Sequence, residues 1–149
     1  MTQAYTYQFT EVFQLGGGLV PDSYAIGIHP TGWDSMANHQ RGFFHLKVGE
    51  MQGGSTVDVQ IWQATDAAGA GAQIVAGKAI TQLTAAGGDG GDDVCIEIRT
   101  EEMDVADDYC YINAYVTVGG AASELAATMF LGASNYPPVP VTAWTEIID

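Results

Sequence analysis

The fold is decided by the stretch that reads TVDVQIWQATDAAGAGAQIVAGKAITQLT (residues 56–84), GGDGGDD (87–93) and VCIEIRTEEMDVADDYCYINAYVTV (94–118). Within it, apolar and polar residues alternate in short runs, and clusters of Gly, Asp or Ala-Gly separate these runs. Alternation with a period of two over such short spans is typical of half-buried β-strands. We therefore expect an all-β chain whose strands each bury one face.

The alternation also predicts which side chains form the core. On each predicted strand the aliphatic and aromatic residues of one parity share a face, because successive side chains of a strand point in opposite directions. The residues assigned to the core face are Phe44, Leu46, Val48, Val57, Val59, Ile61, Val94, Ile96, Ile98, Ile112, Ala114, Val116, Val118, Leu125, Ala127, Met129 and Leu131.

Glycine and proline predict the connections. The segment QLGGGLVPDS (14–23) is expected to be a loop, because three glycines and a Pro-Asp pair interrupt regular structure. A short strand at 24–28 is expected to stop at Pro30, and residues 29–42 are expected to form a long polar loop. The strands at 94–99 and 109–118 are predicted to pair with each other as a hairpin.

The length of 149 residues suits one domain with a substantial core. The predicted architecture is an antiparallel β-sandwich of about 7–8 strands, with extended arms at both ends. Residues 1–14 are assigned to an N-terminal extended arm or first strand, 15–133 to the sandwich, and 134–149 to a proline-rich tail. The prolines exclude a central strand in that tail and favour an extended conformation.

The charge balance limits the expected partners. Eighteen acidic residues against four basic ones give a formal net charge of −14. Nucleic-acid binding needs clustered cations, and anionic membranes attract them, so neither partner is expected. No apolar run approaches the roughly 20 residues that span a bilayer, and the N-terminus lacks the pattern of a signal peptide. The expectation is therefore a protein assembled in the cytoplasm. The basic residues, far apart in the sequence, are Arg41, Lys47, Lys78 and Arg99.

Cys95 and Cys110 are expected to remain free thiols. Cys95 has the opposite parity to Ile96 and Ile98, whereas Cys110 shares the parity of Ile112 and the aliphatic residues that follow it. If both strands bury their aliphatic side in one core, the two thiols point in opposite directions. A disulfide needs converging Cβ positions.

Outward-facing aromatic residues are the candidate partner-binding residues. Trp62 is predicted to face out from its strand, and Tyr109, Tyr111 and Tyr115 share the side opposite the aliphatic residues. A row of tyrosines suits an interface, because each ring offers contact area and a hydroxyl. A second covered layer within the same domain explains the row equally well. The full candidate set is Trp33, Trp62, Tyr109, Tyr111, Tyr115, Tyr136 and Trp144.

The sequence shows no motif for catalysis or for a cofactor. His29, His39 and His45 stand at no paired ligand spacing, and GGDGGDD lacks the full EF-hand pattern, so no metal is expected. There is no G-x-S-x-G, and the glycine strings lack the Lys and Ser/Thr of a P-loop. We therefore expect no catalytic residues, no cofactor and no enzyme activity.

Four strand-and-turn segments resemble a known family. TVDVQIWQATDAAG (56–69), AITQLT (79–84), DVADDYCY (104–111) and VTVGGAAS (116–123) together resemble the small virion proteins of tailed bacteriophages. The likeness covers residues 42–138. It implies a structural component of a phage particle, commonly a head decoration (cement) protein in symmetric oligomers that are often trimers. The sandwich it implies is jelly-roll-like, and an immunoglobulin-like topology remains open. It brings no catalytic residues with it.

The expected function is therefore capsid decoration. In this role the chain would sit on the capsid surface of the virion, bind the outer face of the shell built by the major capsid protein, and stabilise that shell. Two alternatives remain open. One is another virion role, as a head–tail joining, tail or fibre component. The other is a carbohydrate-binding β-sandwich with Trp33 and Trp62 as stacking platforms.

Overall fold

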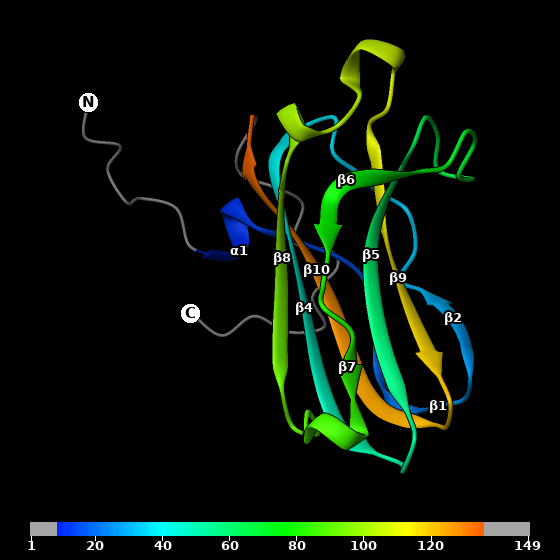
Figure 1. The fold of residues 1–149 in the computed structure, drawn as a ribbon. Coiled ribbons are helices and arrows are strands. Elements are labelled where there is room, and N and C mark those ends of the chain that lie inside the picture. Colours follow the sequence, from blue (N-terminus) through cyan, green and yellow to red (C-terminus); the bar gives the residue numbers. More distant parts are fainter. Residues whose placement is uncertain (1–8, 136–149) are drawn as a thin grey trace.

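The computed structural model describes residues 9–135, which form two antiparallel sheets packed face to face (Figure 1). Sheet A has the order β1-β10-β4-β8, and its strands are β1 (Gln14–Tyr24), β10 (Ser123–Ser134), β4 (His39–Met51) and β8 (Asp93–Arg99). Sheet B has the order β2-β9-β5-β6, and its strands are β2 (Gly27–Pro30), β9 (Tyr111–Gly119), β5 (Thr56–Ala64) and β6 (Gln73–Ala79).

The remaining elements are short. In sheet B, β3 (Asp34–Ser35) pairs with β9, and β7 (Leu83–Thr84) pairs with β5. The helical turns are α1 (Phe9–Val12) and the 3-10 turns η1 (Ala85–Gly87), η2 (Thr100–Glu102) and η3 (Val105–Asp107). Among the described residues, no helix is long and apolar enough to cross a membrane.

The connectivity is that of a jelly roll. If β3 and β7 are set aside, eight strands remain in two sheets of four. The first and eighth are neighbours in sheet A, and the second and seventh are neighbours in sheet B, as in two nested Greek keys. The prediction of an all-β, jelly-roll-like sandwich of about 7–8 strands is confirmed, with β3 and β7 as two-residue additions.

The core lies between the sheets, and the predicted alternation places it correctly. Phe44, Leu46 and Val48 on β4 have no exposed surface, and neither have Val57 and Ile61 on β5. The aliphatic faces of β9 and β10 are buried against them. Of the predicted core residues, only Val94 is partly exposed, at the edge of the cluster.

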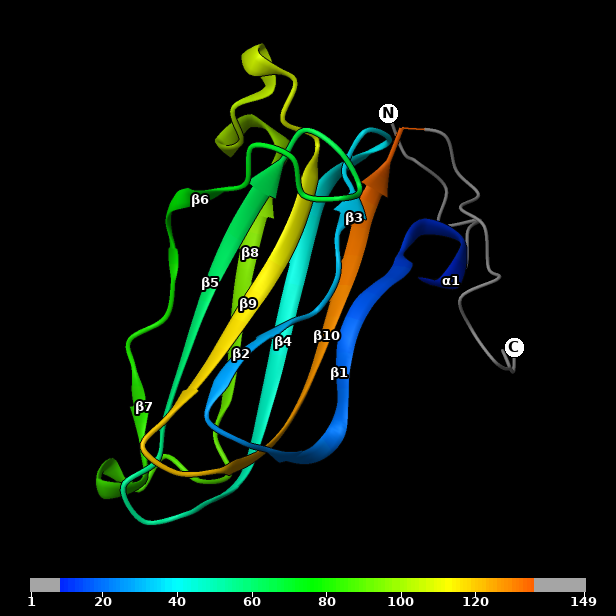
Figure 2. The same cartoon turned by 90° about the vertical axis from the view of Figure 1, so that its right-hand side faces the viewer.

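The prediction of a loop at residues 14–23 is wrong, because this segment forms β1. As an edge strand, β1 pairs only with β10, with register shifts between Leu15 and Gly18 and between Leu19 and Asp22. A Cβ on Gly17 would lie 2.1 Å from the Thr31 carbonyl oxygen, so glycine permits an approach that any other residue would block. Pro21 is tolerated because an edge strand has one unpaired side (Figure 2).

The predicted hairpin of residues 94–99 and 109–118 is also wrong. β8 pairs with β4 in sheet A, whereas β9 pairs with β5 and β2 in sheet B. Residues 100–110 cross from one sheet to the other at the end of the sandwich, through η2 and η3 (Figure 1). Met103, 5% exposed, belongs to the core between the sheets and anchors this crossing. Both strands bury an aliphatic face in one core, but from opposite sides.

Three smaller predictions are corrected as well. The long polar loop at 29–42 contains β3 and the start of β4, and Met36 in its middle is 1% exposed. The strand predicted at 24–28 begins at Gly27 and includes Pro30, which pairs with Tyr115 from the sheet edge. The extended conformation expected over residues 1–14 gives way at Phe9–Val12 to a turn of α-helix.

The predicted terminal arms lie largely outside the described part of the chain, whereas the prediction of free thiols is confirmed. Residues 1–8 and 136–149, which hold most of both predicted arms together with Tyr136 and Trp144, lie outside the described residues. Cys95 and Cys110 are free thiols, as predicted. Cys95 is exposed on the outer face of sheet A, and Cys110 is half-buried just before β9.

Candidate protein-binding surface

The outer face of sheet B carries a packed group of aromatic rings. Trp62 on β5 stacks on Tyr115 of β9, with ring centroids 5.0 Å apart and planes inclined by 22°. Trp33, from the connection between β2 and β3, meets Tyr115 edge to face at 6.3 Å. We call Trp33, Trp62 and Tyr115 the aromatic layer. The structure therefore brings together three of the predicted candidates that lie far apart in the sequence.

Asn113 explains why Trp33 reaches this face. Its side-chain oxygen accepts hydrogen bonds from the Thr31 N–H (3.1 Å), the Thr31 hydroxyl (3.2 Å) and the Gly32 N–H (3.2 Å). The residue is 2% exposed. These bonds hold residues 31–32 across the outward side of β9 and so deliver Trp33 to Tyr115. Sequence reasoning missed Asn113. The only available signal was an amide on a strand whose other outward residues are mainly aromatic.

The three tyrosines of the predicted row have different surroundings. Tyr109 precedes β9, and its hydroxyl donates a hydrogen bond to the Gly71 carbonyl (2.8 Å), which ties down the connection between β5 and β6. Tyr111 lies beside Ser35 of β3 and Ala64 of β5. Only Tyr115 enters the aromatic layer. The structure thus gives the row two roles: Tyr109 holds a loop, and Tyr115 belongs to an outer layer of packed rings.

Exposed aliphatic residues flank the aromatic layer. Ile28 on β2 is 61% exposed and shares the outer face with Thr117, its neighbour on β9. Ile74 on β6 is 55% exposed and lies beside Trp62. Trp33, Trp62 and Tyr115 are themselves half-buried. These apolar side chains therefore come from four adjacent strands of sheet B, and from the connection that carries Trp33. We call Ile28 and Ile74 together with the aromatic layer the sheet B surface.

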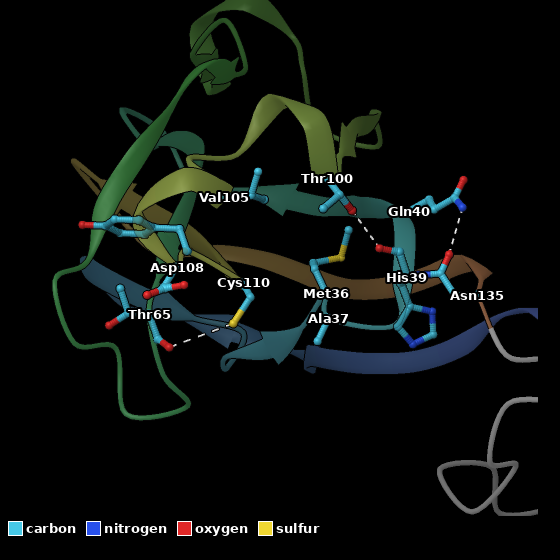
Figure 3. A pocket seen from close by; sticks show the side chains of 11 residues that line it. Met36, Ala37, His39, Gln40, Thr65, Thr100, Val105, Asp108, Cys110 and Asn135 are labelled. Carbon is cyan, nitrogen blue, oxygen red and sulfur yellow. Dashed lines mark hydrogen bonds between the residues drawn. The ribbon is translucent and has the colours of Figure 1, made fainter.

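A depression lies elsewhere, at the end of the sandwich where the 100–110 segment crosses (Figure 3). It has a volume of about 500 Å³ and is open to solvent. His39 and Cys110 lie on either side of Met36 there. His39 Nε2 lies 3.2 Å from Gln14 Oε1, and Cys110 Sγ lies 4.0 Å from the Thr65 carbonyl oxygen. Burial lowers the pKa of His39, so the ring is neutral near pH 7.

The three histidines have different hydrogen-bond partners, and one of these partners lies in the acidic segment at residues 87–93. His29 bonds to the Ala25 carbonyl (2.8 Å), whereas His45 bonds to Asp93 (2.9 Å). Asp93 also pairs with Lys47, and hydrogen bonds from Lys47 and His45 lower the pKa of its carboxyl. Within residues 9–135, no group of three or more His, Cys, Asp or Glu side chains is placed to hold a metal ion.

Comparisons with known proteins find only distant likeness. No protein-family model matches the sequence, and no curated protein matches it. Two solved structures of infectious bursal disease virus are similar over 85% of this chain, both at 13% identity. The TM-score is 0.47 for the Gx strain and 0.44 for the Gt strain, and the match spans 33% and 35% of those chains. This chain therefore covers about a third of the length of those chains.

Proposed function

We propose that the chain is a structural subunit of a virus particle and, within that role, a head decoration protein that binds the major capsid shell. The observation that supports this best is the sheet B surface, in which a packed aromatic layer lies between the exposed Ile28 and Ile74. Contiguous exposed apolar surface on a domain is a mark of protein–protein contact. The resemblance to tailed-phage virion proteins agrees with this role.

The aromatic layer is already ordered before any partner binds. Trp62 and Tyr115 stack on each other, and the bonds of Asn113 hold the backbone that leads to Trp33. A surface whose large side chains are already fixed loses little conformational entropy on binding. Jelly rolls serve in viral capsids, in lectins and in cupins. The fold is therefore compatible with the proposal, while the surface supplies the argument for it.

The charges fit a protein partner better than a nucleic acid. Each of the four basic residues forms an ion pair within the chain. With a formal charge of −14, the protein would be repelled by packaged DNA. In the proposed role, copies of the chain in a symmetric oligomer, expected to be a trimer, bind the assembled shell more tightly than a loosened one. That difference stabilises the shell by mass action.

A carbohydrate-binding role ranks second. The jelly roll also occurs in lectins, and the sheet B surface is rich in tryptophan. However, Trp62 and Tyr115 each use one ring face for their mutual stacking. A Cβ on Gly69 would lie 2.6 Å from Trp33 Nε1, so the edge of Trp33 is covered by the β5–β6 connection. Rings held in this way offer less free surface for stacking on a sugar.

The test is co-expression with the major capsid protein encoded in the same genome, followed by gradient purification of the assembled shells. We expect the chain to co-purify in far more copies than the single ring of a head–tail joining protein. The double variant Ile28→Ser/Ile74→Ser should lower the affinity for shells by at least about tenfold, because it removes exposed apolar area from the proposed contact.

The matched control is Val20→Ser, which removes an aliphatic side chain that is 70% exposed on β1 of the other sheet. Its occupancy on shells should equal that of the unmodified chain. Shells that carry no copies would refute the decoration role, and a ring-like copy number would favour the joining role. Binding on a glycan array that Trp62→Ala abolishes would favour the carbohydrate-binding alternative.

A further inference from the structure

The outer face of sheet A carries a second apolar patch, which none of the residues predicted for partner binding occupies. Leu15 on β1, Phe130 on β10 and Phe43 on β4 are direct neighbours in register across three strands. All three point away from the core, since the residues that flank them on β10 and β4, such as Met129 and Phe44, are buried. Outward positions of a sheet that meets water are ordinarily polar.

The α1 turn adds two more rings to this patch. Phe9 and Phe13 stack with ring centroids 4.4 Å apart. A Cβ on Gly132 of β10 would lie 2.5 Å from a ring carbon of Phe13, so this ring rests directly on the strand. Phe9 remains 59% exposed and Phe43 39% exposed. We call Phe9, Phe13, Leu15, Phe43 and Phe130 the phenylalanine face.

Two ion pairs lie beside this face. Arg41 pairs with Glu97, and Lys47 pairs with Asp93, on the outward side of β4 and β8. The crossing segment beyond the end of the sheets holds five acids, of which Glu101 pairs with Arg99 and Glu102 with Lys78 (Figure 1). The other three are Asp104, Asp107 and Asp108. Two copies of a chain with a charge of −14 repel each other least where opposite charges cancel.

The ends of the described chain favour a second copy as the occupant. The described part of the chain begins at Phe9, within the face, and ends at Asn135. The Asn135 side chain accepts a hydrogen bond from Gln40 at the start of β4 (2.9 Å). Eight residues precede Phe9 and 14 follow Asn135, and they include Tyr5, Tyr7, Tyr136 and Trp144. The described part of the chain therefore ends beside this face, and the chain that continues from both ends is rich in aromatic residues.

We propose that the phenylalanine face is the surface through which copies of this chain associate. This proposal names the contact surface of the oligomer in the proposed function. It rests on that function only for the premise that copies of the chain assemble. The partner surface it fits is apolar and aromatic with paired charges beside it, which is the chemistry of another copy of this chain.

The test measures the mass of the purified full chain, without shells, by light scattering and by sedimentation over a concentration series. We expect an oligomer whose dissociation constant rises by at least about tenfold in Phe43→Ser and in Phe9→Ser, since exposed aromatic anchors carry much of an interface's affinity. The matched control is Ile74→Ser, an exposed apolar residue on the opposite sheet, which should leave the mass unchanged. Circular dichroism and thermal melting confirm that each variant is folded.

Two results would overturn the inference. One is a chain that stays monomeric at all concentrations, as it would if its own end segments covered the face. The other is an oligomer that Phe43→Ser and Phe9→Ser leave intact while Ile74→Ser dissociates it. A different result would refute the decoration role and leave this inference standing. In that case the co-expressed shells carry no copies of the chain, while the chain in solution still forms an oligomer that Phe43→Ser dissociates.

Discussion

Lys78 on β6 donates a hydrogen bond to the backbone carbonyl of Glu97 on β8, with Nζ 2.8 Å from the oxygen, although the two strands belong to different sheets. The same Nζ lies 2.8 Å from the Glu102 carboxylate, and the Lys78 side chain is only 18% exposed. This lysine closes one open side of the sandwich and occupies an acceptor on an edge strand. Such an acceptor would otherwise be available to a foreign strand.

We predict that Lys78→Met lowers the free energy of unfolding by about 1–2 kcal/mol, since a hydrogen bond from a charged donor to the Glu97 carbonyl is lost. The hydrogen bond from Lys78 is the main cause that lowers the pKa of Glu102, so the pair stabilises the fold above the unfolded-state pKa. Its contribution is lost as the pH falls through the folded-state pKa. Urea unfolding of both proteins at about pH 7 and pH 4 measures the effect.

Lys47→Met is the matched control, because it removes the same charge from a side chain that is 51% exposed within one sheet. It should cost less than Lys78→Met. Equal losses in the two variants would mean that net charge, and not the inter-sheet bond, determines the effect.

Asp34 is predicted to make the fold less stable when it is ionised. Its carboxylate accepts the Gly17 N–H at 2.8 Å and so ties β3 to β1 on the other open side of the sandwich. Burial raises the pKa of this carboxyl, and the bond from Gly17 opposes the rise only in part. A raised folded-state pKa means that stability increases as the pH falls through that value. Asp34→Asn keeps an acceptor for Gly17 but removes the charge.

The stability of Asp34→Asn relative to the unmodified chain should therefore be higher at about pH 7 than at about pH 4. The comparison at each pH cancels the contributions of Asp93 and Glu102, whose carboxyl pKa values are lowered and which act in the opposite direction. A relative stability that is constant across this range would contradict the prediction.

Asn113→Ala is predicted to lower the free energy of unfolding by about 2 kcal/mol, because the Thr31 hydroxyl and the Gly32 N–H lose a buried acceptor. The variant should also loosen Trp33 from Tyr115 and change the tryptophan fluorescence of the native state. Gln52→Ala, at an exposed position in the turn between β4 and β5, is the control and should change neither quantity. Native fluorescence that is unchanged in Asn113→Ala would show that Trp33 is held by other contacts.

Gly17→Ala is predicted to destabilise the chain by about 1–3 kcal/mol, since the new Cβ would clash with the Thr31 carbonyl and push β1 outward. Gly53→Ala is the control, because a Cβ there meets nothing within 4 Å. Thermal melting of both variants checks the difference. If Gly17→Ala were as stable as the control, β1 would not need its close approach to the 31–33 segment.

The shape of the sheet B surface shows the limit of sequence reasoning about the site. Parity along the chain correctly places Trp62 and Tyr115 on outward faces, because the side-chain direction follows from strand geometry alone. It cannot show that β5 and β9 are neighbours, nor that Asn113 draws Trp33 across them. The phenylalanine face is equally invisible in the sequence, because Leu15, Phe43 and Phe130 become neighbours only through the pairing of three distant strands.

The sequence by itself determined the class of fold and the composition of the core. Period-two alternation assigns each residue of a strand to one of two faces, and burial of apolar surface then chooses which face turns inward. The tertiary structure decided which strands pair, because β8 and β9 carry the same kind of pattern and fit either sheet. It also decided that the glycine-rich segment 14–23 is a strand, since the close backbone approach at Gly17 arises only once β1 lies against Thr31. Local propensity is read along the chain, whereas these contacts join residues far apart in it.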